Sequence, residues 1–186
     1  MEEIDKNSIV YHRDVVELVT VAVRYCAYLE EPVADYPRTE FVDTLLKLLP
    51  LLYLKGMLLP DIDSDESVDL SDVVTEENYN IVRNNVACVM GEHDDYLDVF
   101  VDDMKYSDTP ILMTVSENLA DIYQDLKNFV VLYKDGTEET MTEAIAQCRQ
   151  NFKYYWGQRV ANVMRALHDV RFVALDGEDA EADTFQ

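Results

Sequence analysis

Basic side chains are scarce in this sequence. Its 186 residues include 15 Lys and Arg against 38 Asp and Glu, which gives a formal net charge of −23. A charge of this sign and size repels the phosphates of nucleic acids and the headgroups of anionic lipids. The composition therefore argues against nucleic acid as a partner, and it favours a well-solvated surface or a basic protein partner.

Cysteine is also rare, and the three cysteines are far apart. Cys26, Cys88 and Cys148 form neither a CxxC pair nor an even set. Their number and spacing suggest neither a disulfide framework nor a zinc site. We expect three reduced thiols in the core, because each cysteine lies on or next to an apolar stripe of a predicted helix.

No apolar run is long enough to cross a membrane. The most apolar stretch, residues 45–59, is interrupted by two lysines and a proline, and it is shorter than the roughly 20 residues that a spanning helix needs. The N-terminal segment MEEIDKNS lacks the basic start and the apolar segment of a secretory signal. We therefore expect a cytoplasmic protein without a membrane partner.

Glycine and proline, which interrupt helices, occur only five times each. The apolar residues recur mostly at spacings of three and four, which is the period of an amphipathic helix. This pattern predicts an all-α fold, with residues 1–173 as a single domain built as an irregular bundle of about five long helices. Residues 174–186 are predicted to form an acidic tail.

Start and stop signals set the expected boundaries of these helices. Pro50 is expected to bend or restart the second helix, since proline lacks the amide proton that would bond to the preceding turn, and Gly56 is a candidate for its end. Thr75 is expected to cap the third helix, and either Thr114 or Ser116 the fourth. The five helices are predicted near residues 8–31, 39–58, 76–104, 114–135 and 138–173.

An acidic loop, residues 60–74, separates the second and third helices, and its oxygen ligands have the spacing of a calcium-binding EF-hand loop that would run from Asp61 to Asp72. However, position 6, where the motif needs Gly, is Glu66, and Asp72 is one methylene shorter than the bidentate Glu of the motif. Because the chain is rich in acidic residues, such alternation also arises without a site. We interpret the loop as a solvated connection and expect no cofactor, with calcium or magnesium as the less favoured alternative.

Two of the predicted helices carry carboxylates at helical spacing: Asp95 and Asp98 in the third, and Asp121 and Asp125 in the fourth. Such spacing can present several oxygens to Mg²⁺, as in all-helical hydrolases that cleave nucleotide phosphoanhydrides. On a helical wheel, however, most of these carboxylates lie opposite the apolar stripes. We therefore favour a solvated face over a magnesium site, and no Glu-x-x-His pair is present for a di-iron site.

Three further residues depart from the amphipathic pattern. His93 falls within the apolar stripe predicted for the third helix, and we favour a hydrogen-bonded core histidine over a catalytic base, since no Ser or Cys nucleophile is visibly paired with it. Arg159 lies among apolar residues of the fifth helix, where we expect an ion pair with a carboxylate before an anion-binding site. Trp156 precedes Gly157, and we interpret this aromatic segment as close helix packing before a ligand pocket. The candidate binding residues are His93, Asp95, Asp98, Asp121, Asp125, Trp156 and Arg159.

Three long strings are specific for family membership: GEHDDYLDVFVDDMKYSDTPI, VSENLADIYQDLKNF and NFKYYWGQRVANVMRALH. Through them the chain resembles an uncharacterised bacterial family, a domain of unknown function. The resemblance runs from the first predicted helix to His168, and the acidic loop and tail are its variable parts. It implies a small helical cytosolic protein and brings no activity, cofactor or catalytic residue with it.

Two functions from different classes follow from these patterns. The first is a non-enzymatic protein-interaction module whose acidic helical surfaces meet a basic protein partner. The alternative is a divalent-metal-dependent phosphoanhydride hydrolase that uses the helix-borne carboxylates, with Arg159 on phosphate. We favour the module, because the sequence shows no complete catalytic set and we assign no catalytic residue. Association of copies through the aromatic face of the fifth helix is a third hypothesis.

Overall fold

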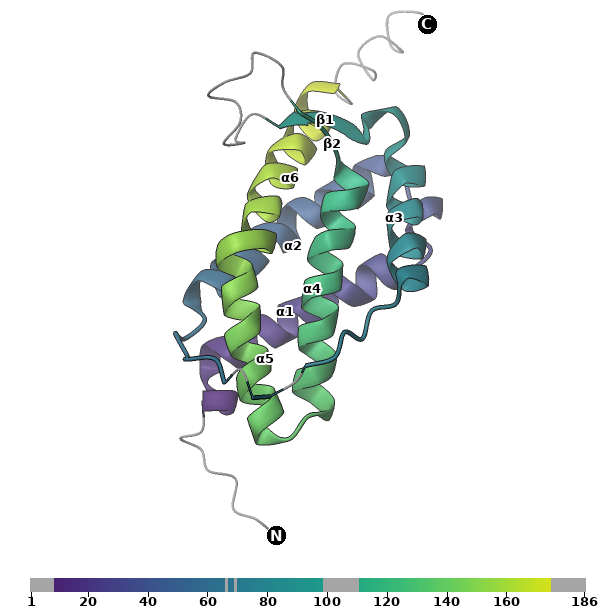
Figure 1. The fold of residues 1–186 in the computed structure, drawn as a ribbon. Coiled ribbons are helices and arrows are strands. Elements are labelled where there is room, and N and C mark those ends of the chain that lie inside the picture. The colour runs from purple at the N-terminus through teal and green to yellow at the C-terminus, as the bar shows by residue number, and fades with distance from the viewer. Residues whose placement is uncertain (1–8, 66, 69, 99–110, 175–186) are drawn as a thin grey trace, which may run out of the picture.

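The apolar stripes of the sequence become the inner faces of six α-helices in the computed structural model, which describes residues 9–65, 67–68, 70–98 and 111–174. These residues form one all-α domain, as predicted, with a hairpin of two short strands at one end (Figure 1). The N-terminal segment MEEIDKNS and nearly all of the predicted acidic tail lie outside the described residues. The helices are α1 (Arg13–Glu30), α2 (Arg38–Leu58), α3 (Glu76–Met90), α4 (Val115–Asp135), α5 (Glu138–Asn151) and α6 (Gly157–Asp169).

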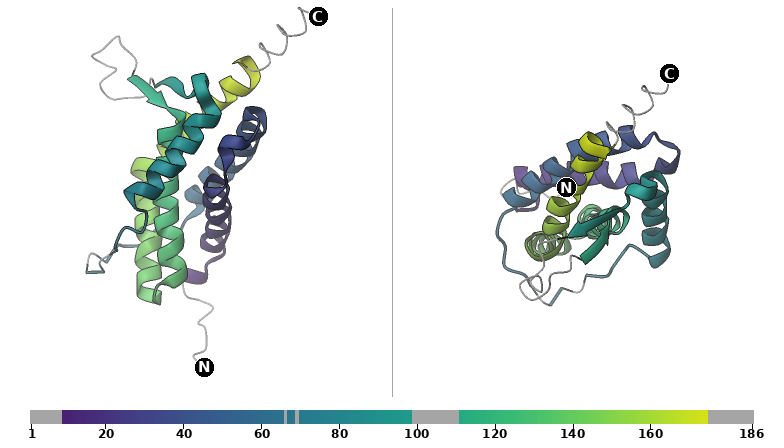
Figure 2. Two further views of the ribbon diagram at one scale, coloured as in Figure 1. Left: turned by 90° about the vertical axis from the view of Figure 1, so that its right-hand side faces the viewer. Right: turned by 90° about the horizontal axis from the view of Figure 1, so that it is seen from above.

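The helices pack in two layers around one hydrophobic core. In Figure 2 (left), α1 and α2 form one layer, and α3, α4 and the α5–α6 run form the other. Helix α4 is central, because it packs against α1, α3, α5 and α6. Leu18, Leu49 and Leu126 lie between the layers and are fully buried. Burial of apolar side chains on this scale is the main force that holds the helices together.

The third helix is much shorter than predicted. It ends at Met90, because Gly91 has a φ of 56°, a backbone conformation that glycine adopts without steric cost. A 3₁₀ turn at Gly91–His93 and a β-strand then replace the predicted helical residues. The prediction of a helix over residues 76–104 is therefore wrong beyond Met90, and residues 99–104 lie outside the described part of the chain.

The hairpin that follows is fastened to the start of α4. Strand β1 (Asp95–Asp98) pairs antiparallel with β2 (Ile111–Thr114). Thr114 ends β2 and caps α4, since its hydroxyl accepts a hydrogen bond from the amide of Glu117 at 3.2 Å, which confirms one of the two predicted caps. The carboxylate of Asp94 accepts from the amide of Ser116 at 2.8 Å. These contacts set the position of β1 relative to the bundle.

The predicted fifth helix is interrupted by a π-helical segment. Helical conformation continues from α5 through a π segment at Phe152–Trp156 into α6, and a second π segment follows at Val170–Ala174. The indole nitrogen of Trp156 donates to the carbonyl of Cys148 at 3.2 Å, across this segment. Single-turn π segments are rare and occur often at functional sites, which makes this part of the chain a candidate for one.

Two cysteines lie in the core and one does not. Cys26 and Cys148 are buried, as predicted, whereas Cys88 is exposed on α3. The buried face of α3 contains Val82, Val86 and Val89, and Cys88 lies about 100° away from Val89 around the helix axis. The prediction of a core thiol at residue 88 is therefore wrong.

Gly56 lies inside α2 and does not end it, contrary to the sequence prediction, and the helix also continues through Pro50. A Cβ atom at residue 56 would lie 2.6 Å from the Phe152 ring and 2.8 Å from the Trp156 ring. Both rings are buried and cannot move aside without disturbing the core. The close approach predicted at Gly157 thus has a counterpart on α2, where the helix meets the aromatic π segment.

The first prediction concerns this contact. Gly56→Ala should lower the free energy of unfolding by about 1 to 2 kcal/mol, because the cost of overpacking exceeds the gain in helix propensity from replacing glycine. Urea denaturation followed by circular dichroism measures the change. An equal or higher unfolding midpoint for the variant would contradict this packing.

Candidate functional site

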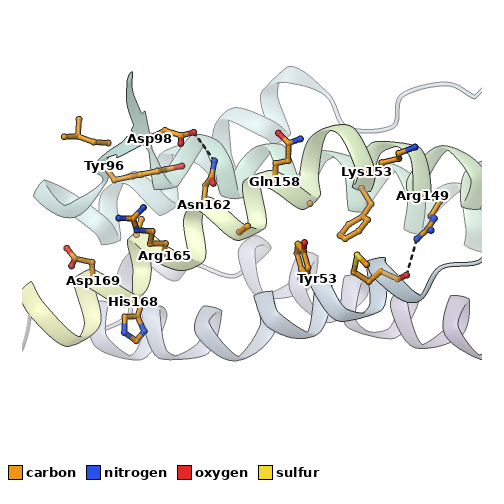
Figure 3. A pocket seen from close by; sticks show the side chains of 16 residues that line it. Tyr53, Tyr96, Asp98, Arg149, Lys153, Gln158, Asn162, Arg165, His168 and Asp169 are labelled. Carbon is orange, nitrogen blue, oxygen red and sulfur yellow. Dashed lines mark hydrogen bonds between the residues drawn. The ribbon is translucent and has the colours of Figure 1, made fainter. Parts of the chain in front are cut away.

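A groove runs along α6, with α2 as one wall and β1 at one end of the other wall (Figure 3). Its volume is about 1250 Å³. Helix α2 contributes Tyr53 and Met57, β1 contributes Tyr96, and α6 contributes Gln158 and Arg165. The groove therefore combines aromatic and apolar surface with polar side chains from elements that are far apart in the sequence.

Two amide side chains hold β1 beside α6. The alternation of the strand gives Tyr96 and Asp98 the same, half-buried face. Asn118 of α4 donates to the hydroxyl of Tyr96 at 2.7 Å, and Asn162 of α6 donates to the carboxylate of Asp98 at 2.9 Å. Burial raises the pKa of Tyr96 to about 12, so the phenol stays neutral and keeps its hydroxyl proton at neutral pH.

The groove also gathers cationic side chains. Arg149 donates to the carbonyls of Gly56 and Met57 at the C-terminal end of α2, at 3.3 and 3.2 Å. The ammonium group of Lys153 lies 4.8 Å from the centre of the neighbouring Tyr154 ring. Arg165 is exposed and makes no hydrogen bond or ion pair with any described residue. Arginine with an unengaged guanidinium is suited to bind a carboxylate or a phosphate of a ligand.

A second polar cluster lies outside the groove, between α3, α4 and α6. Arg159 donates to Asp121 at 2.7 Å, and the hydroxyl of Tyr79 donates to the other oxygen of the same carboxylate at 2.8 Å. The guanidinium carbon of Arg159 also lies 3.7 Å from the centre of the Tyr155 ring. The predicted ion pair of Arg159 is thus confirmed. The predicted solvated face is wrong for Asp121, whose side chain is only 19% exposed.

Asp125 is the most perturbed carboxyl group of α4. One of its oxygens accepts a hydrogen bond from Asn151 at 2.7 Å, and the other is buried without a hydrogen-bond partner among the described residues. Burial, reinforced by the nearby charge of Asp121, raises the pKa of Asp125 to about 6. Asp125 therefore does not lie on a solvated face.

The second prediction follows from this raised pKa. The folded protein binds the proton of Asp125 more tightly than the unfolded chain does, so the stabilising effect of protonation is complete below pH 3.8 and is lost as the pH rises through about 6. Asp125→Asn should therefore raise the free energy of unfolding by about 1 to 2 kcal/mol at neutral pH and change it little at about pH 4. Urea denaturation at both pH values measures the difference.

The matched control is Asp63→Asn at an exposed loop position. A surface substitution of this kind is expected to change the free energy of unfolding by less than about 0.5 kcal/mol at either pH. If Asp125→Asn destabilised the protein equally at both pH values, the carboxylate would not be perturbed as described.

The remaining candidates lie apart from one another. Asp95 is exposed on β1, and Trp156 is fully buried in the core. His93 ends the 3₁₀ turn after α3 and is half-buried, so its prediction as a core histidine on a helix is wrong. Asp95 and Asp98 lie on a strand, which also corrects their helical placement. Among the described residues, no three His, Cys, Asp or Glu side chains come close enough together to hold a metal ion.

The acidic loop is tied to the bundle by two side chains. Glu143 of α5 accepts hydrogen bonds from the hydroxyl of Ser64 and, at 2.6 Å, from the amide of Asp65. Asn128 of α4 donates to Asp72 at 3.0 Å and accepts from two amides of the next residues. The loop thus crosses α4 and α5 as a strap with exposed carboxylates. Two residues of the EF-hand comparison, Glu66 at position 6 and Asp69 at position 9, lie outside the described residues.

Sequence reasoning did not find the groove. Gln158, Asn162 and Arg165 recur at spacings of four and three, which places them on one face of α6. This polar face was a usable signal for one wall. The contributions of Tyr53 and Tyr96 were not predictable, because only the folded structure brings α2 and β1 to that face.

In the described part of the chain, no helix is long and apolar enough to span a membrane. No curated protein matches this chain. The crystal structure of protein BF1032 from Bacteroides fragilis, a structural genomics target, is similar to it, with 42% sequence identity and a TM-score of 0.79. The similarity covers 89% of this chain and 96% of the other. The profile of a domain of unknown function, DUF5063, matches residues 9–173. The chain therefore belongs to the DUF5063 family.

Proposed function

We propose that this protein is a non-enzymatic interaction module that binds a segment of a partner protein in the groove along α6. The main support for this proposal is the residue composition of the groove. Tyrosine, methionine and arginine are enriched in the cores of protein interfaces, and the groove contains Tyr53, Tyr96, Met57 and Arg165. Met57 is 54% exposed and Leu97 is 58% exposed, so the groove offers apolar surface that a partner would cover.

The length of the groove favours a peptide segment over a small molecule. Its lining extends along the helical run from Arg149 to Asp169, which corresponds to about 30 Å at the rise of an α-helix. An extended peptide of about nine residues has this length. Sites for small molecules enclose most of the ligand within about 300 to 1000 Å³, whereas this groove is open along its length and larger.

The proposal is tested by a substitution that fills the groove with a large side chain. Ala161 is exposed on α6 and lines the groove, so Ala161→Trp should block it without disturbing the core. Affinity purification from an extract of the source cells should recover a partner with the wild-type chain and lose it with this variant. The matched control is Ala27→Trp, at an exposed position of α1 that does not line the groove. Recovery of the same partners with all three chains would overturn the proposal.

The net charge also predicts a basic protein partner, which is a separate prediction. Such a partner would bind the acidic loop, residues 60–74, that forms the strap. Asp61, Asp63 and Asp72 are exposed there. A partner held by these carboxylates should be recovered at low salt and released at high salt, because salt screens exposed charges. The absence of any specific partner at low salt would contradict this prediction.

The phosphoanhydride hydrolase also stays a prediction. The structure places its candidate carboxylates differently from the helical arrangement that the sequence predicted. Asp95 and Asp98 lie on a strand, and Asp121 is already engaged by Arg159 and Tyr79. Magnesium titration with a panel of nucleotides would detect the activity, and no turnover across the panel would remove the hypothesis. As part of the interaction proposal we place the module in the cytoplasm, where the exposed thiol of Cys88 would stay reduced.

A further inference from the structure

We infer that the segment bound in the groove is acidic: an extended peptide with carboxylates near both ends of the contact and an apolar residue between them. This inference rests on the proposed function and specifies the chemistry of its partner. It reverses the expectation from net charge, because the local charge of the groove differs from that of the whole chain.

The lining of the groove is enriched in cations. Arg149, Lys153 and Arg165 supply one fifth of all the Lys and Arg residues of the chain, whereas two acidic residues of the described part of the chain, Asp98 and Asp169, line the groove. Asp98 keeps its charge, but its carboxylate is held against α6 by a hydrogen bond from Asn162, so the described lining has three cations against two carboxylates. In a chain with a net charge of −23, this local excess of positive charge favours an anionic ligand at this surface and disfavours a basic one.

The cations lie toward the two ends of the groove. Arg149 and Lys153 mark one end, and Arg165, with His168 nearby, marks the other (Figure 3). Lys153 and Arg165 are twelve positions apart along a continuous helical run, which corresponds to about 18 Å. An extended chain covers this distance in five or six residues. Two carboxylates separated by that number of residues could therefore meet both ends at once.

The surface between the cations contains a low, apolar floor beside the polar side chains of α6. Gly157 and Ala161 are one helical turn apart and both line the groove. A Cβ atom at residue 157 would lie 2.9 Å from the Phe152 ring, so the packing of the π segment requires glycine there. Tyr53 and Met57 of α2 border this part of the groove. An apolar side chain of the bound segment fits over this floor, between its two acidic ends.

The net charge of the protein opposes an acidic ligand only at long range. At about 0.15 M salt the screening length is about 8 Å, so charges on distant faces act weakly in the groove. A carboxylate in contact with Arg165 would instead form a charge-assisted hydrogen bond, which is about twice as strong as a neutral one. At this ionic strength the nearby cations therefore decide which ligand binds.

The experiment is a selection from a displayed library of random peptides on the full chain at about 0.15 M salt, with counter-selection against Ala161→Trp. The counter-selection removes basic peptides that bind elsewhere, because this variant keeps the full net charge. The selected peptides should be enriched in pairs of Asp or Glu five or six residues apart with an apolar residue between. Arg165→Glu should weaken their binding about tenfold or more, measured by fluorescence anisotropy.

The matched control is Lys134→Glu, which makes the same change of charge at an exposed residue near the end of α4, outside the groove. It should weaken binding less than about twofold. Groove-dependent peptides that are neutral or basic, or that bind Arg165→Glu as tightly as the wild-type chain, would overturn the inference and leave the proposed function standing. If no peptide distinguished the wild-type chain from Ala161→Trp, both would fall.

Discussion

Replacing Trp156 with alanine should lower the free energy of unfolding by about 3 to 5 kcal/mol. The indole is fully buried, and its ring lies edge-on against Phe152 with the ring centres 4.7 Å apart. Its nitrogen also donates to the carbonyl of Cys148. Alanine would leave a cavity where α2 meets the π segment, and the surrounding rings cannot fill it without moving the backbone.

Urea denaturation at neutral pH measures this loss. The matched control is Tyr154→Ala in the same π segment, because Tyr154 is 62% exposed and should contribute less than about 0.5 kcal/mol. If Trp156→Ala cost less than about 1 kcal/mol, the indole would not be part of the core. Trp156 would then return as a candidate for contact with a ligand.

The helices that the sequence predicts well are those with local end signals. Thr75 and Thr114 accept hydrogen bonds from the amides of residues 78 and 117, as helix caps do, and α4 stops at Asp135, just before Gly136. These interactions lie within a few residues of the chain, so a sequence reveals them without knowledge of the fold. The start of α3 and both ends of α4 were therefore close to the observed ones.

The third helix shows where this reasoning fails. Past Gly91 the apolar residues still recur at nearly helical spacing, so that Leu97 continues the stripe of Val89 in the sequence. In the structure Leu97 is exposed on β1 instead. A short strand and one turn of helix cannot be distinguished by a single apolar residue. The glycine was the better signal, because its positive φ ends α3 and turns the chain toward the hairpin.

The misplaced carboxylates have a different cause. A helical wheel assigns the face opposite the main apolar stripe to solvent, which holds for a helix at the surface. Helix α4 is central and packs against four other helices. The face that bears Asp121 and Asp125 therefore meets protein, where Arg159 and Asn151 provide their partners. A wheel cannot show how many neighbours a helix has.

The ion pair between Asp121 and Arg159 should stabilise the fold through direct coupling. Asp121→Asn should lower the free energy of unfolding by about 2 to 3 kcal/mol, because it leaves Arg159, only 26% exposed, without a counterion. Arg159→Met should also destabilise the protein, since Asp121 would lose its cationic partner and keep only uncharged partners such as the hydroxyl of Tyr79. The double variant should lose less than the sum of the two changes, by about 1 to 2 kcal/mol.

Urea denaturation of the four proteins gives this coupling energy. The matched control is the same cycle on Lys134 and Asp135, which are 3.9 Å apart with side chains 78% and 66% exposed, where coupling should be close to zero. Additive changes at Asp121 and Arg159 would show that the contact contributes nothing to stability. Arg159 would then be available to bind an anion, which is the role that sequence analysis placed second.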